Sequence, residues 1–234
     1  MRRYNIADLI VDISFKGELL ESRSEKYKTE NILGDADICI DIDPKLIEKR
    51  AKGSSIGYDG YEYLMTGSKF YRELLKFDGF MLHASAVVLD GKAYLFSAPS
   101  GTGKSTHTAL WEKYFNGSDV YVINDDKPAI KLEADGEFYV YGTPWSGKSD
   151  KNANKKAKLQ GICFIERSEE NFIEKINPLD ALQKLVWQTI RPSDTESLDK
   201  LITLNDMLLK KVSVYKMGCR IDTEAVELAY STMK

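Results

Sequence analysis

One stretch of nine residues combines the residue types that bind phosphate. Residues 98–106 read Ala-Pro-Ser-Gly-Thr-Gly-Lys-Ser-Thr, with Ala98 where the common pattern has glycine. Glycines let the backbone curl so that successive N–H groups point at phosphate oxygens. Lys104 supplies a point charge for the β- and γ-phosphates, and the Ser105 hydroxyl suits Mg²⁺. The predicted nucleotide-binding residues are Ser100, Gly101, Thr102, Gly103, Lys104, Ser105 and Thr106.

Two adjacent carboxylates are the second candidate. Asp125 and Asp126 follow a strand-like run at 120–123, so we expect them near the phosphate loop at one edge of the sheet. One can hold Mg²⁺, directly or through water, and the other can accept the proton of an acceptor hydroxyl. Alone, such a pair is more often a polar turn. We name Asp126 and Ser105 as metal ligands, but strand alternation turns the two carboxylates apart and leaves their roles open.

The loop at 142–148, Gly-Thr-Pro-Trp-Ser-Gly-Lys, combines turn residues with an aromatic ring and a cation. We predict a lid in which Lys148 meets the transferred phosphate and Trp145 covers the ligand. The alternative is a solvated basic loop. Arg167, at the end of the next expected strand, could reach the same site, or it could form a surface ion pair with Glu166.

The sequence contains two histidines, His83 and His107. His83 falls in a strand-like run at 81–89, where a lone histidine is more often a partly buried structural residue. His107 shares one face of the expected 104–115 helix with Leu110, Trp111 and Tyr114, which indicates packing.

Hydrophobic periodicity and turn residues predict the strands and helices that position these candidate residues. Asp90-Gly91 predicts a hairpin between 81–89 and the strand 92–97. Helix signals follow at Pro178, at Ser193 or Asp194, and at Asp222. The other expected elements are a hairpin of 129–133 with 137–141, a strand at 159–166, helices at 178–190 and 194–211, and a strand at 212–217. These elements predict an α/β fold, a mixed sheet with helices.

Residues 1–78 indicate a smaller α+β segment, which we separate from an ATP-binding domain at 79–234. Within it, 38–42 alternates as a half-buried strand does, and 68–77 has helical spacing. The glycines around 53–60 predict a loop. No motif in this segment indicates its role beyond shaping an acceptor site.

The composition excludes several classes of protein. The chain has 234 residues and a formal net charge of −3, which disfavours a nucleic-acid groove. Cys39, Cys163 and Cys219 are far apart and odd in number, so neither a disulfide framework nor a structural zinc site is expected. No apolar run approaches a membrane span, and no signal peptide is visible. We expect a cytoplasmic protein with no membrane partner, whose oligomeric state is open.

The order of these motifs resembles the shared nucleotide core of HPr kinase/phosphorylase and ATP-dependent phosphoenolpyruvate carboxykinase. The residues that carry the resemblance are His83-Ala84-Ser85-Ala86, Gly91, Phe96, residues 100–106 and Asn124-Asp125-Asp126. It covers about residues 80–145. The resemblance implies a carboxykinase-like P-loop core, with His83 facing the metal–phosphate region and Asp125 and Asp126 as metal ligand and base.

The departures from these families narrow the prediction. The chain is much shorter than a carboxykinase, and HPr kinases carry an acidic–basic pair where this chain has Tyr139, Val140 and Tyr141 before Gly142. We therefore predict a Mg²⁺-requiring kinase that transfers the γ-phosphoryl group of ATP to a hydroxyl of a protein, peptide or small molecule. The alternatives are a non-catalytic nucleotide-binding module and a carboxykinase-type lyase.

Overall fold

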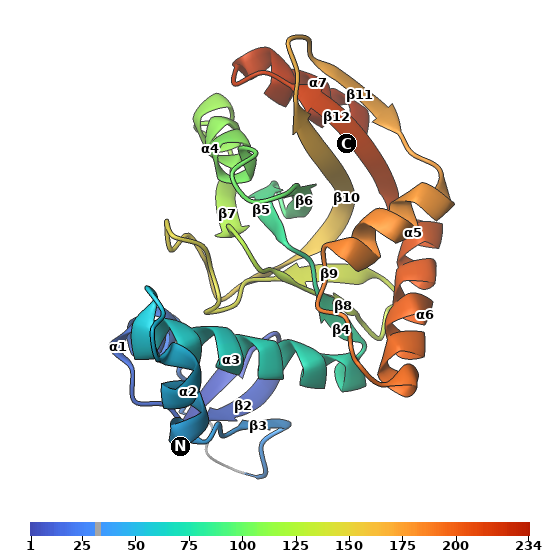
Figure 1. The fold of residues 1–234 in the computed structure, drawn as a ribbon. Helices are drawn as coiled ribbons and strands as arrows, with labels where there is room; N and C mark the ends of the chain where they lie inside the picture. Colours follow the sequence, from blue (N-terminus) through green and yellow to red (C-terminus); the bar gives the residue numbers. More distant parts are fainter. Residues whose placement is uncertain (31–33) are drawn as a thin grey trace.

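The protein is built on two β-sheets, as the computed structural model shows for residues 1–30 and 34–234 (Figure 1). The smaller sheet has the order β1 (Arg2–Ile6), β2 (Leu9–Ile13) and β3 (Ile38–Ile40). The larger sheet runs β4-β8-β9-β10-β6-β5-β7, and β12 and β11 extend it from β10. Its strands pair both parallel and antiparallel, which confirms the predicted α/β class with a mixed sheet.

The large sheet is organised around its longest strand, β10 (Lys156–Arg167). Its first residues pair antiparallel with β9, and its later residues lie parallel to β6 on one side and to β12 on the other. The other strands of this sheet are β4 (Gly79–Met81), β5 (Ala84–Leu89), β6 (Lys92–Ser97), β7 (Val120–Asn124), β8 (Ala129–Leu132), β9 (Phe138–Tyr141), β11 (Phe172–Lys175) and β12 (Ser213–Cys219).

Helices cover both faces of the large sheet. On one face lie α4 (Lys104–Tyr114) and α7 (Thr223–Met233), and on the other lie α5 (Pro178–Trp187) and α6 (Thr195–Lys211) (Figure 1). The predicted helix starts are confirmed. Asp194 and Asp222 cap α6 and α7 by accepting hydrogen bonds from backbone N–H groups three residues on, at 2.8 and 3.0 Å.

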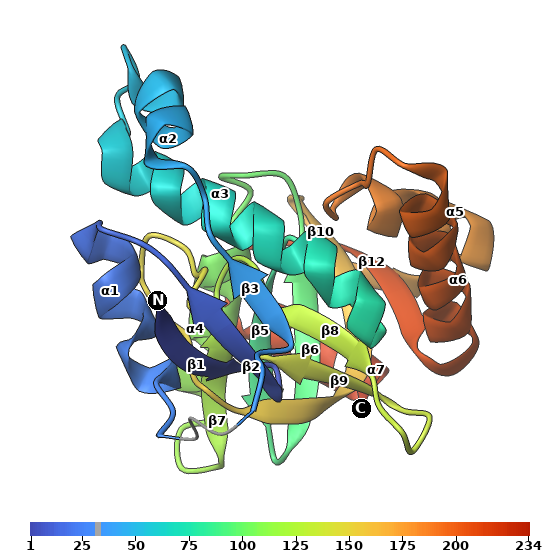
Figure 2. The ribbon, with the colours of Figure 1, turned by 90° about the horizontal axis from the view of Figure 1, so that it is seen from below.

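The N-terminal segment packs its first and third helices on the small sheet and on the β4-β8-β9 end of the large one, and its second helix packs on the third (Figure 2). Its helices are α1 (Glu18–Ser24), α2 (Pro44–Ala51) and α3 (Gly57–Leu74), with short 3-10 turns at Glu25–Tyr27 and Leu75–Phe77. The predicted loop at 53–60 is wrong in its second half because α3 begins at Gly57. Burial of the apolar face of α3, which includes Tyr63 and Phe70, stabilises the helical conformation from Gly57 onward in spite of the glycines.

The predicted continuous strand at 81–89 is also corrected. β4 ends at Met81 and pairs with β8, whereas β5 begins at Ala84 and pairs with β6 and β7. Between them the chain changes neighbours, and the N–H of His83 donates to Gln188 O at 2.7 Å. His83 therefore lies just before β5, not within a strand.

His107 packs in the core, as predicted, with only 3% of its surface exposed. Its ring meets Phe96 edge to face at 4.4 Å, and its Nε2 accepts a hydrogen bond from Trp111 at 3.2 Å. Burial lowers the pKa of His107 from 6.5 to about 4.

This lowered pKa predicts acid sensitivity of the fold. The unfolded chain takes up a proton at His107 below pH 6.5 and the folded chain only near pH 4, so protonation favours unfolding between these values. We expect the free energy of unfolding to fall by about 3 kcal/mol across this window. Urea denaturation over a pH series would measure it. The difference in the free energy of unfolding between wild type and His107→Gln should change by about this amount across the window. Parallel curves for the two proteins would contradict the prediction.

Candidate functional site

Strand directions bring three chain segments together at one edge of the large sheet. β6 and β7 are both antiparallel to β5, so the carboxyl ends of β6 and β7 meet the start of β5. The phosphate loop follows β6, Asp125 and Asp126 follow β7, and His83 precedes β5. These segments and a turn at 147–149 enclose a cavity of about 560 Å³. Its lining residues are His83, Ser100, Gly101, Gly103, Lys104, Ser105, Thr106, Asp125, Asp126, Gly147, Lys148 and Ser149.

The phosphate loop has the curled backbone that its sequence predicts. Gly101 and Gly103 have φ values of +79° and +124°, which favour glycine. α4 begins at Lys104, and the N–H groups of its first turn have no intrahelical acceptor, so they are available to an anion. Lys104 Nζ donates to Ala98 O at 2.8 Å, and burial lowers the pKa of this ammonium from its usual value.

Asp126 lies in a chain of polar contacts that ends at α5. His83 Nε2 is 3.2 Å from Asp126 Oδ1, and His83 Nδ1 is 3.1 Å from Gln188 Oε1. The second carboxylate oxygen of Asp126 accepts from Lys127. Burial raises the pKa of Asp126, but the hydrogen bonds and charges of His83 and Lys127 outweigh it and lower this pKa to about 2. Asp126 is therefore ionised at neutral pH.

Asp125 is tied to the loop that follows β9. One of its carboxylate oxygens accepts from the N–H of Gly147 at 2.5 Å, and the other accepts from the Ser149 hydroxyl. The carboxylate is buried, and the exposed Lys148 lies between its two partners. Asp125 thus holds Lys148 at the rim of the cavity, and the contact of Lys148 with a transferred phosphate stays a prediction.

The prediction for Trp145 is wrong. Its side chain is 1% exposed and stacks on Phe70 of α3 at 4.8 Å between ring centroids. It belongs to the hydrophobic cluster of the N-terminal segment and does not line the cavity. A large ring gains more from packing between α3 and β9 than from a solvent-exposed loop, so Trp145 anchors the loop and does not cover a ligand.

Arg167 does not share a cavity with Lys148, contrary to our expectation. It lies at the end of β10, and its Nη2 donates to Gly101 O at 2.8 Å. Its Nε lies 3.4 Å from Thr102 O. Arg167 lines two other cavities next to the phosphate loop, and Thr102 lines the same two. The guanidinium therefore supports the outer side of the loop, and it forms no ion pair with Glu166 within the described chain.

Sequence reasoning missed three polar residues of the site, Lys127, Ser149 and Gln188. Lys127 directly follows the two aspartates, so its position next to them was a usable signal. Gln188 is 105 residues from His83 in the chain and ends α5. Nothing in the sequence around Gln188 indicates this contact, because it depends on how α5 packs against the sheet.

Comparisons with known proteins leave the family of this chain open. No protein-family model and no curated protein match it. Among solved structures, the Hpr(Ser) kinase/phosphatase from Coxiella burnetii aligns with 65% of this chain and 93% of its own, at 14% sequence identity and a TM-score of 0.35. At this TM-score the similarity carries no argument, and the resemblance inferred from the motifs stays a prediction.

Across residues 1–30 and 34–234, each helix is too short or too polar to cross a bilayer.

Proposed function

We propose that this protein is an ATP-dependent, Mg²⁺-requiring phosphotransferase that acts on a hydroxyl group. One observation carries the proposal. The phosphate loop, an ionised Asp126 with its histidine, and Lys148 line the same cavity although four separate segments supply them. Phosphoryl transfer depends mainly on positioning and on neutralising charge, and these residue types supply both.

The contacts of Lys104 support a nucleotide triphosphate as the ligand. Its ammonium is held by two carbonyls of its own loop, Ala98 O at 2.8 Å and Pro99 O at 3.4 Å. Neutral carbonyls are weak partners for a buried cation, so a phosphate oxygen is the stronger acceptor. On the outer side of the loop lies a cavity of about 190 Å³ with apolar walls that include Leu110, Ile165 and Ile221. We assign this cavity to the nucleobase.

The donor set fits Mg²⁺. Ser105 is exposed at the start of α4, and Asp126 across the cavity is ionised. Mg²⁺ prefers hard oxygen ligands and is usually held by one or two protein groups together with substrate phosphates. Ser105 and Asp126 would hold the ion, which when bound neutralises charge on the phosphates.

The remaining cavity residues orient the reaction. Lys148 provides a cation opposite the phosphate loop, at the position where charge develops on the transferred group. His83 connects Asp126 to Gln188 and faces the space that an acceptor would enter. Asp125 keeps Lys148 in place through Gly147 and Ser149.

Calorimetry and a labelled-ATP assay would test this proposal. We expect wild-type protein to bind ATP at millimolar Mg²⁺, and Asp126→Asn to weaken the Mg²⁺-dependent binding by about tenfold or more, the scale seen when metal-site residues are changed. Asp119→Asn, an exposed aspartate that precedes β7, is the control and should bind as wild type does. A wild-type protein that binds no ATP, or an Asp126→Asn variant with unaltered Mg²⁺ dependence, would overturn the proposal. ATP binding without turnover would favour a regulatory module instead.

A further inference from the structure

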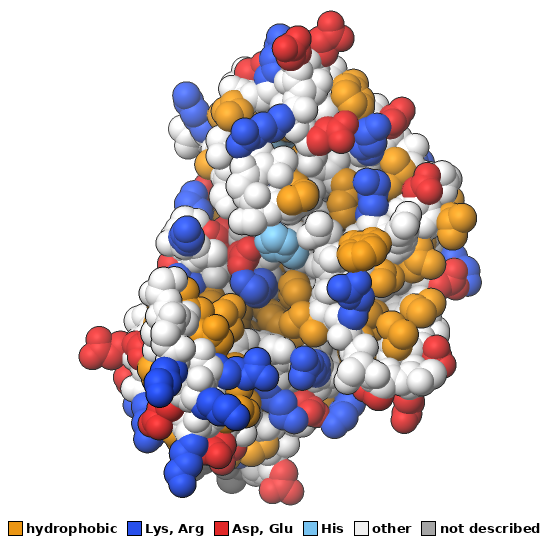
Figure 3. All heavy atoms as spheres, viewed as in Figure 1, with side chains coloured by type: hydrophobic (Ala, Val, Ile, Leu, Met, Phe, Trp, Pro, Cys, Tyr) orange, Lys and Arg blue, Asp and Glu red, His pale blue; other side chains and the backbone are white. Residues whose placement is uncertain are grey.

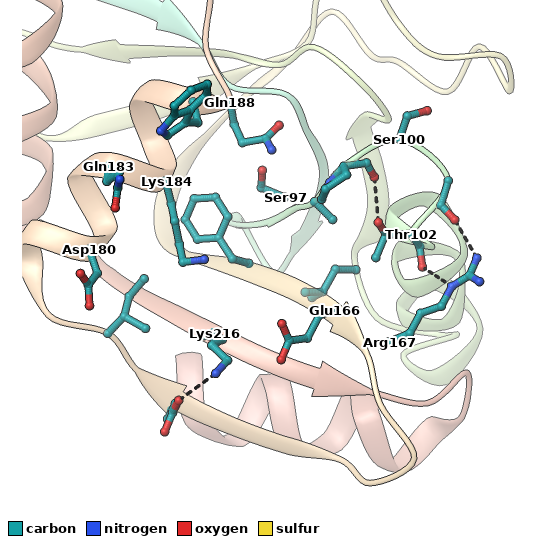
Figure 4. A pocket seen from close by; sticks show the side chains of 18 residues that line it. Ser97, Ser100, Thr102, Glu166, Arg167, Asp180, Gln183, Lys184, Gln188 and Lys216 are labelled. Atoms are coloured by element: carbon teal, nitrogen blue, oxygen red, sulfur yellow. Dashed lines mark hydrogen bonds and ion pairs between the residues drawn. The ribbon is translucent and has the colours of Figure 1, made fainter.

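A cavity larger than the phosphate cavity lies on the other side of the phosphate loop (Figure 4). Its volume is about 1070 Å³, at the upper end of the range for sites that enclose a small ligand. The loop, β10, β12 and α5 surround it. Phe164 and Ile165 of β10, together with Ile176 and Trp187, give it apolar walls.

This cavity adjoins the phosphate cavity. Ser100 and Gly101 line both spaces. On the opposite side, His83 faces the phosphate cavity and Gln188 faces the large cavity, with 3.1 Å between their polar atoms. One pair of side chains therefore separates the two cavities at this point. An acceptor held in the large cavity next to Gln188 would lie close to His83 and the phosphate cavity.

Lys184 gives the α5 side of the large cavity a positive charge. Its ammonium lies 5.6 Å from the centroid of the Phe164 ring and points into the cavity in Figure 4. Among the residues that the structure describes, Lys184 forms no ion pair. Lys216 differs, since it already pairs with Glu174 at 3.4 Å.

Three acidic residues also line the cavity, and one of them, Glu174, is already paired with Lys216. Asp180 is at the start of α5, where it accepts from Asn177 at 2.6 Å. Glu166 lies at the end of β10, beside Arg167 and the phosphate loop (Figure 4). A ligand that lies in the cavity next to Gln188 therefore meets Lys184, one turn earlier on α5, and the aromatic rings of Trp187 and Phe164.

We propose that this cavity binds the phosphoryl acceptor, and that the acceptor carries a carboxylate next to an aromatic or aliphatic group. Lys184 would pair with the carboxylate, and Trp187 and Phe164 would contact the apolar group. This inference rests on the proposed function. In the transfer, the bond between the γ-phosphorus and the β–γ bridging oxygen breaks as the acceptor oxygen bonds to phosphorus. The hydroxyl proton is released and ADP leaves.

Pairs of acceptors that differ only in the charge of one group would test the proposal. In the small-molecule arm, L-tyrosine is compared with tyramine, which lacks the carboxylate. In the peptide arm, acetylated peptides with a serine between Phe and Glu are compared with the same peptides carrying Lys for Glu. We expect wild-type protein to phosphorylate the carboxylate-bearing member of at least one pair about tenfold faster, and the arm that responds identifies the source of the ligand.

Variants on α5 make the test specific. Lys184→Glu should reverse the preference within that pair, and a reversal cannot result from poor folding. Trp187→Ala should slow transfer to both members by about tenfold. Leu179→Ala, an exposed residue of the same helix outside the cavity, is the control and should keep the wild-type preference.

Two results would overturn the inference while the proposed function survives. One is a wild-type protein that binds ATP and phosphorylates both members of each pair at equal rates. The other is a Lys184→Glu variant with the wild-type preference. Calorimetry with ATP on every variant separates these results from loss of the nucleotide site. If wild-type protein does not bind ATP, the proposed function fails and this inference fails with it.

Discussion

Replacing Lys104 by alanine is expected to reduce phosphoryl transfer by about 10²-fold or more, the scale on which loss of one preorganised donor acts. Lys104 is the cation at the start of α4, and its ammonium is already held inside the loop by Ala98 O and Pro99 O. Little side-chain ordering remains when a phosphate oxygen replaces these carbonyls. A labelled-ATP assay with the best acceptor found would measure the loss.

Lys113→Ala is the matched control for this result. Lys113 lies in the last turn of the same helix and is exposed. Its removal deletes an equal charge at the opposite end of α4 and should leave transfer within about twofold, because exposed charges are screened over that length. Full transfer by Lys104→Ala, or equal losses in both variants, would contradict the assignment of Lys104.

The second large effect concerns stability. Trp145→Ala is expected to lower the free energy of unfolding by about 3–5 kcal/mol, as other buried tryptophan deletions do. Trp145 stacks on Phe70 at 4.8 Å and meets Tyr71 edge to face at 5.7 Å, and its indole N–H donates to Thr66 at 3.3 Å. Its removal leaves a cavity and takes one donor from the Thr66 hydroxyl, which still donates to Glu62 O at 2.7 Å. Urea denaturation at neutral pH would give the difference.

Trp187→Ala provides the same chemical change at a solvent-exposed position. Trp187 is 64% exposed at the end of α5, so its deletion should change the free energy of unfolding by less than about 1 kcal/mol. If Trp145→Ala proves as mild as Trp187→Ala, the loop after β9 is not anchored as the structure indicates. If Trp145→Ala stays folded but no longer anchors the loop, Lys148 is no longer held at the cavity. Phosphoryl transfer should then fall while ATP binding persists.

The part of the fold around the phosphate loop was predictable because its signals are local. Asp90-Gly91 specifies a tight turn between two apolar runs, and Asp194 and Asp222 each cap the helix that follows them. The phosphate loop needs glycine at two positions with positive φ, and the sequence has both. The meeting of this loop with the two aspartates follows from strand order, since each follows a strand that pairs with β5.

The errors share a different cause, which is that the deciding contacts are distant in sequence. Trp145 reads as a loop residue until α3 is placed against it, and the start of α3 at Gly57 reads as a loop until its buried face is known. The contact of His83 with Gln188 joins residues 105 positions apart. Neither hydrophobic periodicity nor capping residues contain this information, because both describe neighbours along the chain.

The burial of Trp145 and Tyr141 among residues of the first 78 has a consequence for the order of folding during synthesis. The small sheet and α3 leave the ribosome early, yet their hydrophobic cluster needs these two rings from β9 and the loop after it. Arg23 and Tyr63 likewise find Ser146 O only then, at 2.8 and 2.7 Å. The nascent N-terminal segment therefore keeps an exposed apolar surface until residue 145 has left the ribosome, and such long-range closure slows folding and exposes the chain to association with chaperones.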